Sequence, residues 1–185
     1  MDFLKRFIGA VFDFLQSIVV IMAIMVMVYL FVISPQEISG ESMYPTFENG
    51  EYILTNKVEY KLRDPKVGDV VVFKSPTNKD IDYIKRIIGV PGDRIRVSNG
   101  KYYRNDVLLQ ETFLPTDLFT FAGSFLKENS EITVPSGYYF VSGDNRPHSL
   151  DSREFGTIPK GDIIGRAFLR YWPFDRAGVI KNPTE

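Results

Sequence analysis

Residues 14–36 read FLQSIVVIMAIMVMVYLFVISPQ, a stretch without a single charged side chain. At about 1.5 Å of rise per residue, a helix of this length crosses a hydrocarbon core of about 30 Å. A buried core helix rarely runs so long without a polar face, and the apolar region of a cleaved signal sequence is shorter, at about 7–15 residues. The stretch therefore predicts an uncleaved transmembrane helix over residues 14–36, with the lipid bilayer as its partner.

The charges that flank this stretch predict which way the helix points. Lys5 and Arg6 come before it. The acidic side chains that follow it are Glu37, Glu41, Glu48 and Glu51. Because positively charged flanks stay in the cytoplasm, we expect residues 1–13 there as a cytoplasmic N-terminus. The chain beyond residue 36 is then expected on the extracytoplasmic face of the cell membrane, after a single pass.

The composition excludes several classes of site. The 185 residues contain no cysteine, which excludes a thiol nucleophile, a disulfide framework and a zinc–thiolate site. His148 is the single histidine of the chain, which argues against a histidine-based metal centre. The net charge is −1, so the charge balance does not point to a nucleic-acid partner. We therefore expect no metal, no cofactor and no nucleic acid.

Beyond residue 36 the chain consists of short β-prone runs separated by turn signals. These runs cover residues 51–55, 70–74, 83–90, 94–97, 101–103, 107–109, 131–134, 138–142 and 163–171. Short strands at this spacing favour an antiparallel β-domain. The predicted fold class is therefore mainly β, with the membrane helix in front of the β-domain.

Residues 112–129 differ from these runs because they are rich in Phe and Leu but have no clear period. We interpret this segment as irregular structure within an inserted sub-domain. Its large apolar side chains are expected to form the core of that sub-domain, with a membrane-facing rim as the alternative. They are Phe113, Leu114, Phe119, Phe121 and Phe125. Residues 171–174, YWPF, leave the same choice between core and membrane headgroup region.

Ser42 lies directly after the apolar stretch, in the segment Gly40-Glu41-Ser42-Met43-Tyr44-Pro45. Gly40 allows backbone conformations closed to other residues, and Pro45 stiffens the chain after the serine. A stiff turn of this kind aims a hydroxyl and a backbone N–H at the same point. Ser42 is therefore a candidate nucleophile close to the membrane surface, but an alcohol needs a base to act as one.

The possible bases for Ser42 are His148, a carboxylate or a lysine. In a strand over residues 83–89, Lys85 shares its face with Tyr83 and Ile87, and burial among apolar groups lowers the pKa of an amine. To serve as a base near neutral pH, that pKa must fall by about 2–3 units from roughly 10.4. His148 is another base, in a Ser-His-Asp arrangement with an aspartate. The residues alone leave both open, as they do a solvated His148 and a Lys85 that extends to solvent.

A polar cluster lies near the C-terminal end of the predicted domain. It consists of Asp144, Arg146, Ser149, Asp151 and Arg153, and Asp144 or Asp151 would orient His148 in the histidine scheme. One interpretation is a long hydrogen-bonded loop. The other is a set of supporting residues, in which Ser149 holds the lysine amine and an Asp151–Arg153 pair locks the loop.

Together these segments resemble the bacterial type I signal peptidases, membrane-bound Ser/Lys proteases that remove signal peptides from exported proteins. The resemblance rests on four motifs in the family's order behind an anchor: residues 40–46 (GESMYPT), 69–73 (DVVVF), 82–93 (DYIKRIIGVPGD) and 143–153 (GDNRPHSLDSR). It covers most of the chain, and the third motif is highly specific. The single anchor and compact insertion look like the smaller Gram-positive-type members.

The resemblance implies a division of the chain and a role for each candidate residue. Residues 37–96 and 135–185 would form the catalytic β-domain, and residues 97–134 the inserted sub-domain. Ser42 would be the nucleophile, Lys85 the general base, and Ser149 the group that orients the lysine amine. The implied ion pairs are Asp144–Arg86 and Asp151–Arg153. The implied substrate-binding residues are Ile38, Met43, Phe47, Tyr83 and Ile84.

The resemblance also implies the reaction: cleavage of signal peptides from exported preproteins after small residues in an Ala-X-Ala pattern. Some members carry a serine two positions before the nucleophile that helps to bind the oxyanion, and this chain has Gly40 there. The oxyanion donors would then be mostly backbone, beginning with the Ser42 N–H. The rival hypotheses are a Ser-His-Asp protease using His148, a non-enzymatic membrane-tethered β-domain that binds peptides, and a peptidase of the same fold for pilin or conjugation proteins.

Overall fold

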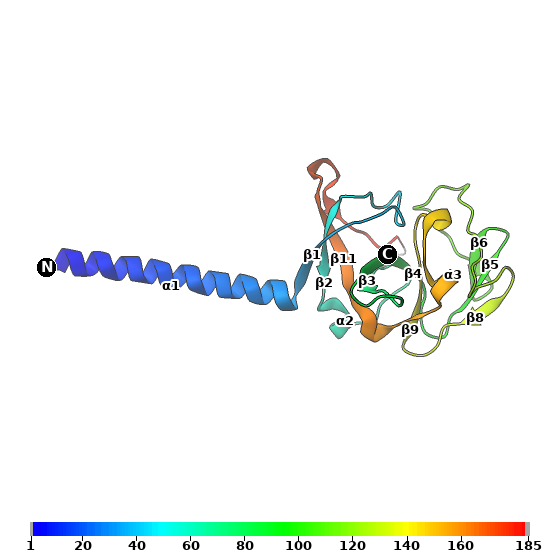
Figure 1. The fold of residues 1–185 in the computed structure, drawn as a ribbon, viewed down its shortest axis with the longest axis horizontal. Coiled ribbons are helices and arrows are strands. Elements are labelled where there is room, and N and C mark those ends of the chain that lie inside the picture. Colours follow the sequence, from blue (N-terminus) through cyan, green and yellow to red (C-terminus); the bar gives the residue numbers. More distant parts are fainter. Residues whose placement is uncertain (1, 184–185) are drawn as a thin grey trace.

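Helix α1 (Asp2–Phe31) extends away from the rest of the protein as a single rod in this computed structural model, which describes residues 2–183 (Figure 1). Its apolar window, within residues 3–31, has a mean hydropathy of 2.5, and no residue of this window is buried in the protein. By length and composition this helix is able to cross a membrane.

The prediction of a helix over residues 14–36 was wrong at its C-terminal end. The helix ends at Phe31, and strand β1 (Ile33–Glu37) follows it. Pro35 lies inside β1 and has no N–H to donate, so it does not continue a helix. The strand forms because it pairs with β2 (Tyr52–Asn56), from Ile33 opposite Asn56 to Glu37 opposite Tyr52. The exit from the helix therefore leads directly into the β-domain.

The larger sheet contains eight strands, all paired antiparallel. Their order is β1-β2-β11-β3-β4-β9-β10, with β12 paired to β11. The strands not yet bounded are β3 (Val70–Lys74), β4 (Asp82–Gly89), β9 (Tyr138–Ser142), β10 (Ile158–Pro159), β11 (Ile163–Trp172) and β12 (Gly178–Val179). The helical segments around this sheet are α2 (Glu59–Leu62), η1 (Arg146–His148), α3 (Ser152–Phe155), η2 (Lys160–Asp162) and η3 (Phe174–Arg176).

A second, four-stranded sheet is inserted between β4 and β9, in the order β7-β6-β5-β8. Its strands are β5 (Arg94–Ser98), β6 (Lys101–Arg104), β7 (Val107–Leu108) and β8 (Glu131–Thr133). Figure 1 places this sheet at the end of the β-domain opposite α1. The boundary at residue 97, which the resemblance implied, falls inside β5, because this strand pairs with β6 and β8 from Arg94 onward.

Three groups of buried apolar side chains form the core, and one of them packs the inserted sheet against the larger one. The group under the inserted sheet comes from its strands and from β4 and β9: Ile88, Ile95, Val97, Tyr102, Leu126, Val134 and Phe140. The prediction that the Phe-rich segment supplies this core was wrong for most of its residues. Leu114 is buried, whereas Phe119, Phe121 and Phe125 are exposed. Leu126 of the same segment is also fully buried in this group and Phe113 is half-buried, so the segment adds to the core but leaves three of its aromatic side chains outside it.

Residues 171–174 form the end of β11 and the start of η3, on the side of the domain that faces α1 in Figure 1. Trp172 and Phe174 are exposed and contact each other, with ring centroids 4.8 Å apart. The core interpretation of this tetrapeptide was therefore wrong for these two side chains. Its contact with a membrane stays a prediction.

Candidate active site

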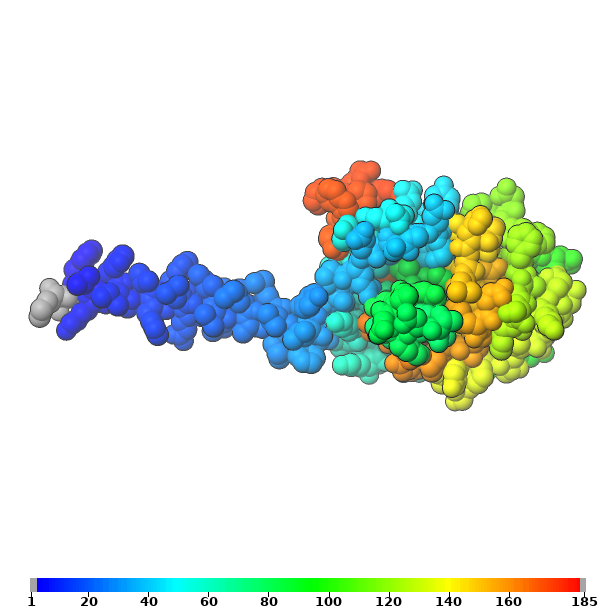
Figure 2. All heavy atoms as spheres, viewed as in Figure 1, coloured from blue at the N-terminus to red at the C-terminus, as the bar shows by residue number. Residues whose placement is uncertain are grey.

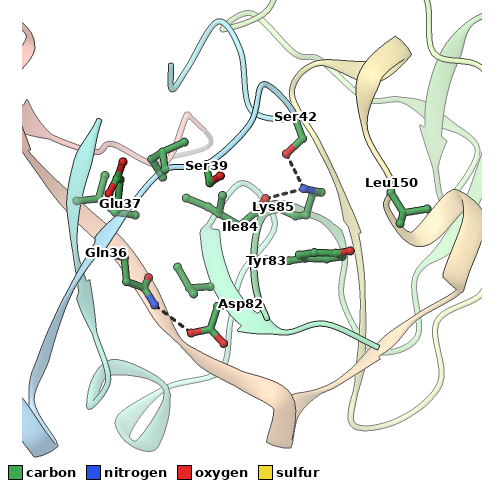
Figure 3. Close-up of a pocket in the computed structure, with 12 residues that line it drawn as sticks. Gln36, Glu37, Ser39, Ser42, Asp82, Tyr83, Ile84, Lys85 and Leu150 are labelled. Carbon is green, nitrogen blue, oxygen red and sulfur yellow. Dashed lines mark hydrogen bonds between the residues drawn. The ribbon is translucent and has the colours of Figure 1, made fainter. Parts of the chain in front are cut away.

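The two residues predicted as nucleophile and base, Ser42 and Lys85, lie next to each other. Lys85 Nζ lies 2.7 Å from Ser42 Oγ, and the two side chains point toward each other (Figure 3). The amine also donates a hydrogen bond of 2.9 Å to the carbonyl oxygen of Ile84. Strand β4 supplies the lysine and the loop before β2 supplies the serine, so residues 43 positions apart in the sequence become hydrogen-bonded neighbours.

The surroundings of Lys85 favour its neutral form. The side chain is 4 % exposed and lies over the ring of Tyr83, with Nζ 5.4 Å from the ring centroid. Burial removes water from the ammonium and lowers the pKa of Lys85 to about 8, although Asp151 and Asp144 act in the opposite direction. Within residues 2–183, no carboxylate forms a hydrogen bond or ion pair with Lys85. The amine is therefore able to give up its proton near neutral pH.

The nucleophile loop is fixed by backbone contacts on both sides of Ser42. Gly40 adopts a φ of +91°, a conformation that side chains disfavour, and its N–H donates to the side chain of Asn49. The Asn145 backbone N–H donates to the carbonyl oxygen of Ser42 at 3.1 Å. Gly143 is required at this crossing, because a Cβ there would lie 2.4 Å from that same oxygen. These contacts hold the serine against the loop that follows β9.

The implied ion pair between Arg86 and Asp144 is present and fully buried. Arg86 Nε donates to Asp144 Oδ1 at 2.9 Å, and Nη2 donates to Oδ2 at 2.6 Å. Thr46 donates to the same carboxylate at 2.5 Å, which connects the pair to the nucleophile loop. The Arg86 guanidinium also lies over the ring of Phe113, 4.1 Å from its centroid. Arg86 and Asp144 therefore join β4, the nucleophile loop and the loop after β9.

The second implied ion pair, between Asp151 and Arg153, is also present. Arg153 Nε donates to Asp151 Oδ1 at 2.8 Å and Nη2 to Oδ2 at 2.7 Å. Burial opposes the charge on Asp151, but the Arg153 guanidinium and the N–H of Gly143 hold the pKa of Asp151 below its usual value. Arg153 Nη2 also donates to the carbonyl oxygen of Arg146 at 2.8 Å. The pair thereby fixes the loop that carries Ser149.

Arg146 is a structural residue that the sequence analysis placed only in the general cluster. Its side chain is buried, forms an ion pair with Glu111 and donates to Thr120 Oγ1 at 2.8 Å. It also donates to the carbonyl oxygen of Gly143 at 2.9 Å. Arg146 therefore ties the long segment between β7 and β8 to the loop beside Ser42. The sequence spacing between Glu111 and Arg146 carries no signal of this contact.

The predicted hydrogen bond between Ser149 and the lysine amine is not made in this structure. Ser149 Oγ is buried and has no hydrogen-bond partner among the described residues. A Cβ built on Gly143 would lie 2.2 Å from this oxygen and 2.4 Å from the carbonyl oxygen of Ser42. Ser149 and Ser42 therefore both pack against Gly143. The hydroxyl is thus next to the serine–lysine pair, while Lys85 is satisfied by Ser42 and Ile84.

His148 is not arranged as a base for Ser42. It ends η1 and is exposed, and within residues 2–183 its side chain forms no hydrogen bond to Ser42, Asp144 or Asp151. Both aspartates are occupied by arginines instead. The geometry therefore favours lysine over histidine as the partner of the serine.

A pocket of about 380 Å³ opens beside the Ser42–Lys85 pair, between β1 and the first half of β4 (Figure 3). Three predicted substrate-binding residues line it: Ile38, Tyr83 and Ile84. Met43 and Phe47 do not line this pocket: they are each 1 % exposed and pack with Ile38 in the core beneath it, so their contact with a substrate stays a prediction. The lining residues that were not predicted are Gln36, Glu37, Ser39, Ile53, Val72, Asp82 and Leu150.

Comparison with known proteins identifies the family. The family model described as "Signal peptidase, peptidase S26" matches residues 11–172. Signal peptidase IB of Staphylococcus aureus (strain COL) is 37% identical over 184 residues, which cover 94% of this chain and 95% of that protein. A probable signal peptidase I-2 of Synechocystis sp. is 38% identical over 161 residues, covering 84% of this chain and 70% of that protein.

Among solved structures, a signal peptidase I from Enterococcus faecalis V583 is similar with 30% sequence identity and a TM-score of 0.47. The match covers 56% of this chain and 97% of that one. The family assignment rests on the sequence matches, which extend over nearly the whole chain. This chain belongs to the signal peptidases, peptidase family S26.

Proposed function

We propose that this membrane-anchored serine peptidase removes signal peptides from exported preproteins with a dyad in which Ser42 is the nucleophile and Lys85 the general base. The observation that carries the proposal is the 2.7 Å contact between a buried amine and a hydroxyl in an open pocket. The pKa of the Lys85 amine, lowered by burial to about 8, lets a useful fraction accept a proton at neutral pH.

In the proposed reaction, neutral Lys85 takes the Ser42 hydroxyl proton while the oxygen attacks the scissile carbonyl. The protonated amine then gives this proton to the leaving amine, and an acyl-enzyme remains on Ser42. A water molecule that the neutral lysine deprotonates releases the signal peptide and restores the serine. Gly40 offers no side-chain donor, so the oxyanion would be bound by backbone N–H groups, with that of Ser42 first.

The substrate would bind as an extended strand. Strand β4 pairs with β9 only from Arg86 onward, so the edge of residues 82–85 is open, and β1 is the outermost strand of the sheet. The pocket lies between these two edges, and both run toward Ser42. A peptide laid into it would add a strand to the sheet through main-chain hydrogen bonds.

The shape of the pocket supports small residues before the cut. Close to Ser42 the lining consists of branched aliphatic side chains, namely Ile38, Ile53, Val72 and Ile84. These side chains narrow the space on the substrate's side, so we propose that the first and third residues before the cut are small, as in Ala-X-Ala. A precursor with Phe in place of either alanine should be cleaved about a hundredfold more slowly than the alanine form.

The decisive test is cleavage of one exported precursor by the full-length protein in liposomes. Ser42→Ala and Lys85→Ala should each abolish cleavage, whereas His148→Ala should keep it. If His148→Ala were inactive and Lys85→Ala active, the histidine scheme would replace the dyad. If Ser42→Ala kept the biological activity, the chain would act as a tethered binding domain.

We also propose that the catalytic domain lies on the extracytoplasmic face, with residues 1–13 in the cytoplasm. The basic residues before the helix and the acidic ones after it support this orientation. Because the chain contains no cysteine, a single cysteine placed at exposed Ser124 reports on one side without background. An impermeant thiol reagent should label this variant in intact cells. Labelling only after lysis would reverse the orientation.

A further inference from the structure

A second pocket, of about 250 Å³, lies at the point where α1 joins the β-domain. Its lining combines three lysines with apolar side chains: Leu30, Phe31, Lys57, Tyr60, Lys61, Lys160, Ile163 and Ile164. No carboxylate belongs to this lining. The pocket is separate from the one beside Ser42 and shares no residue with it.

Strand pairing fixes the pocket at the end of the apolar helix. The Lys57 backbone N–H donates to the carbonyl oxygen of Val32 at 2.8 Å, directly after α1 ends. Lys57 Nζ reaches the carbonyl oxygens of Tyr29 and Leu30, at 3.4 and 3.3 Å. Figures 1 and 2 show α2, which carries Lys61, beside this end of α1. Since α1 is the membrane anchor, the pocket opens at the depth of the lipid headgroups.

The three lysines differ in how their charges are used. Lys57 neutralises the carbonyl end of α1, where the helix dipole is negative. The Lys61 side chain is exposed and forms no hydrogen bond or ion pair within residues 2–183. Lys160 pairs with Asp64, whose side chain is 79% exposed, so solvent screens this contact. Two ammonium groups are therefore available to an anion that enters from the membrane side.

The remaining charged groups near α2 are already paired with one another. Glu59 accepts hydrogen bonds from Arg63 and Arg166, and Asp69 pairs with Arg63. These contacts direct both carboxylates away from the lysines of the pocket. The pocket combines lysines with apolar side chains, which suits a ligand with an anionic headgroup attached to a hydrocarbon chain.

We propose that this pocket binds the phosphate of an anionic phospholipid from the leaflet into which α1 leads. The headgroup phosphate would contact Lys61 and Lys160, and the glycerol and first acyl carbons would lie against Phe31 and Ile164. A bound lipid would fix the rotation of the β-domain about its single anchor, and with it the height of the Ser42 pocket above the membrane. Juxtamembrane lysines have this affinity for anionic lipid surfaces.

The experiment compares lipid retention by the full-length protein in a neutral detergent, measured by native mass spectrometry with added phosphatidylglycerol or phosphatidylcholine. Wild type should retain one phosphatidylglycerol and prefer it at least tenfold over phosphatidylcholine. The double variant Lys61→Gln/Lys160→Gln should lose about tenfold in apparent affinity for phosphatidylglycerol. Lys57 is left unchanged because it also contacts the end of α1.

The matched control is Lys127→Gln/Lys181→Gln, which removes the same charge from exposed positions outside the pocket. It should bind phosphatidylglycerol like wild type. Equal retention by both double variants, or no preference for the anionic lipid in wild type, would overturn the proposal. Competition by millimolar glycerol phosphate as effective as the lipid would identify a free-phosphate site instead, and this would also overturn it. The readout involves no peptide cleavage, so it is independent of the proposed reaction.

Discussion

Strand β4 carries two neighbouring buried cations on opposite faces, and the protein uses them in opposite ways. Lys85 Nζ donates its hydrogen bonds to the neutral oxygens of Ser42 and Ile84. Arg86 meets both carboxylate oxygens of Asp144. Burial without a contacting counter-charge lowers the pKa of the lysine, so its neutral amine can serve as a base. A paired guanidinium keeps its proton and holds the neighbouring segments together. The available partner, and not burial alone, determines the chemistry of each face.

The largest expected effect comes from removing the base. Lys85→Met fills a similar volume without an amine and should lower kcat/KM for a precursor by about a thousandfold, the range of a general base. Lys85→Arg should be equally inactive because a guanidinium does not give up its proton. By contrast, Arg86→Lys should keep cleavage within about tenfold of wild type. An active Lys85→Arg enzyme would show that charge, not proton transfer, is what β4 contributes.

Stability measurements on Lys85→Met separate loss of chemistry from loss of fold. The folded-state pKa of Lys85, about 8, lies below its ordinary value of 10.5, so folding destabilises the ammonium by about 3 kcal/mol below pH 8. Between pH 8 and 10.5 the unfolded state binds more protons, and this penalty disappears as the pH rises. Lys85→Met should therefore unfold at higher denaturant concentration than wild type at pH 7, and the gain should vanish near pH 10.5.

Breaking the other face should act on stability. Asp144→Ala leaves the Arg86 guanidinium buried without its counter-charge, which we expect to lower the free energy of unfolding by about 3–5 kcal/mol. Asp106→Ala is the matched control, because its pair with Arg94 is exposed and should contribute less than about 1 kcal/mol. Denaturant titration in detergent measures both variants. Equal effects would mean that Asp144 does not compensate Arg86.

The period of two along β4 made its pair of faces predictable from the sequence. Alternation places Lys85 on the same face as Tyr83 and Ile87, and the apolar residues around it predict that it is buried. The ion pairs Arg86–Asp144 and Asp151–Arg153 followed from the family resemblance and are present. These features depend on local pattern or on a short motif, which a single sequence contains.

The sequence is least informative where long-range packing decides. Residues 33–36 look like the end of an apolar helix, but pairing with β2 makes them part of a strand. Met43 flanks the nucleophile in sequence, yet it packs into the core beneath the pocket. Phe119 and Phe121 are as apolar as any core residue, but they are exposed, whereas Leu126 of the same segment packs with the strands in that core. Sequence near a motif does not state which way a side chain points.

Ser149 is a candidate partner for Lys85 in a later step of the proposed reaction, although the two are not hydrogen-bonded in this structure. Its buried hydroxyl has no hydrogen-bond partner within residues 2–183, a state that costs about 1–3 kcal/mol and that a later step can relieve. When Ser42 is acylated, the lysine amine loses its serine partner, and Ser149 is positioned beside the same crossing at Gly143. Ser149→Ala should therefore lower kcat about 10–100-fold without lowering stability.

The control for this variant is Ser142→Ala, because Ser142 Oγ bonds both Tyr102 and Asp151. That variant should lose stability, by about 1–3 kcal/mol, through the buried groups it leaves unpaired. If Ser149→Ala cleaves as fast as wild type, Ser149 only fills space over Gly143. The two serines thus distinguish a hydroxyl that holds the fold from one that serves the reaction.

The smallest expected effect, and the most direct test of the contrast on β4, is the pH dependence of cleavage. With the pKa of Lys85 near 8, about one enzyme in ten carries the neutral amine at pH 7 and about nine in ten at pH 9. Because the neutral form is the base, kcat/KM should rise about tenfold over this interval and level off above it. Measuring kcat/KM in liposomes from pH 6 to pH 10, with a precursor that lacks titrating side chains near the cut, gives the profile.

Arg86→Lys should show the same midpoint, since the amine it introduces pairs with Asp144 and takes no part in proton transfer. A flat wild-type profile would mean that the amine on the Ser42 face does not exchange its proton during the rate-limiting step.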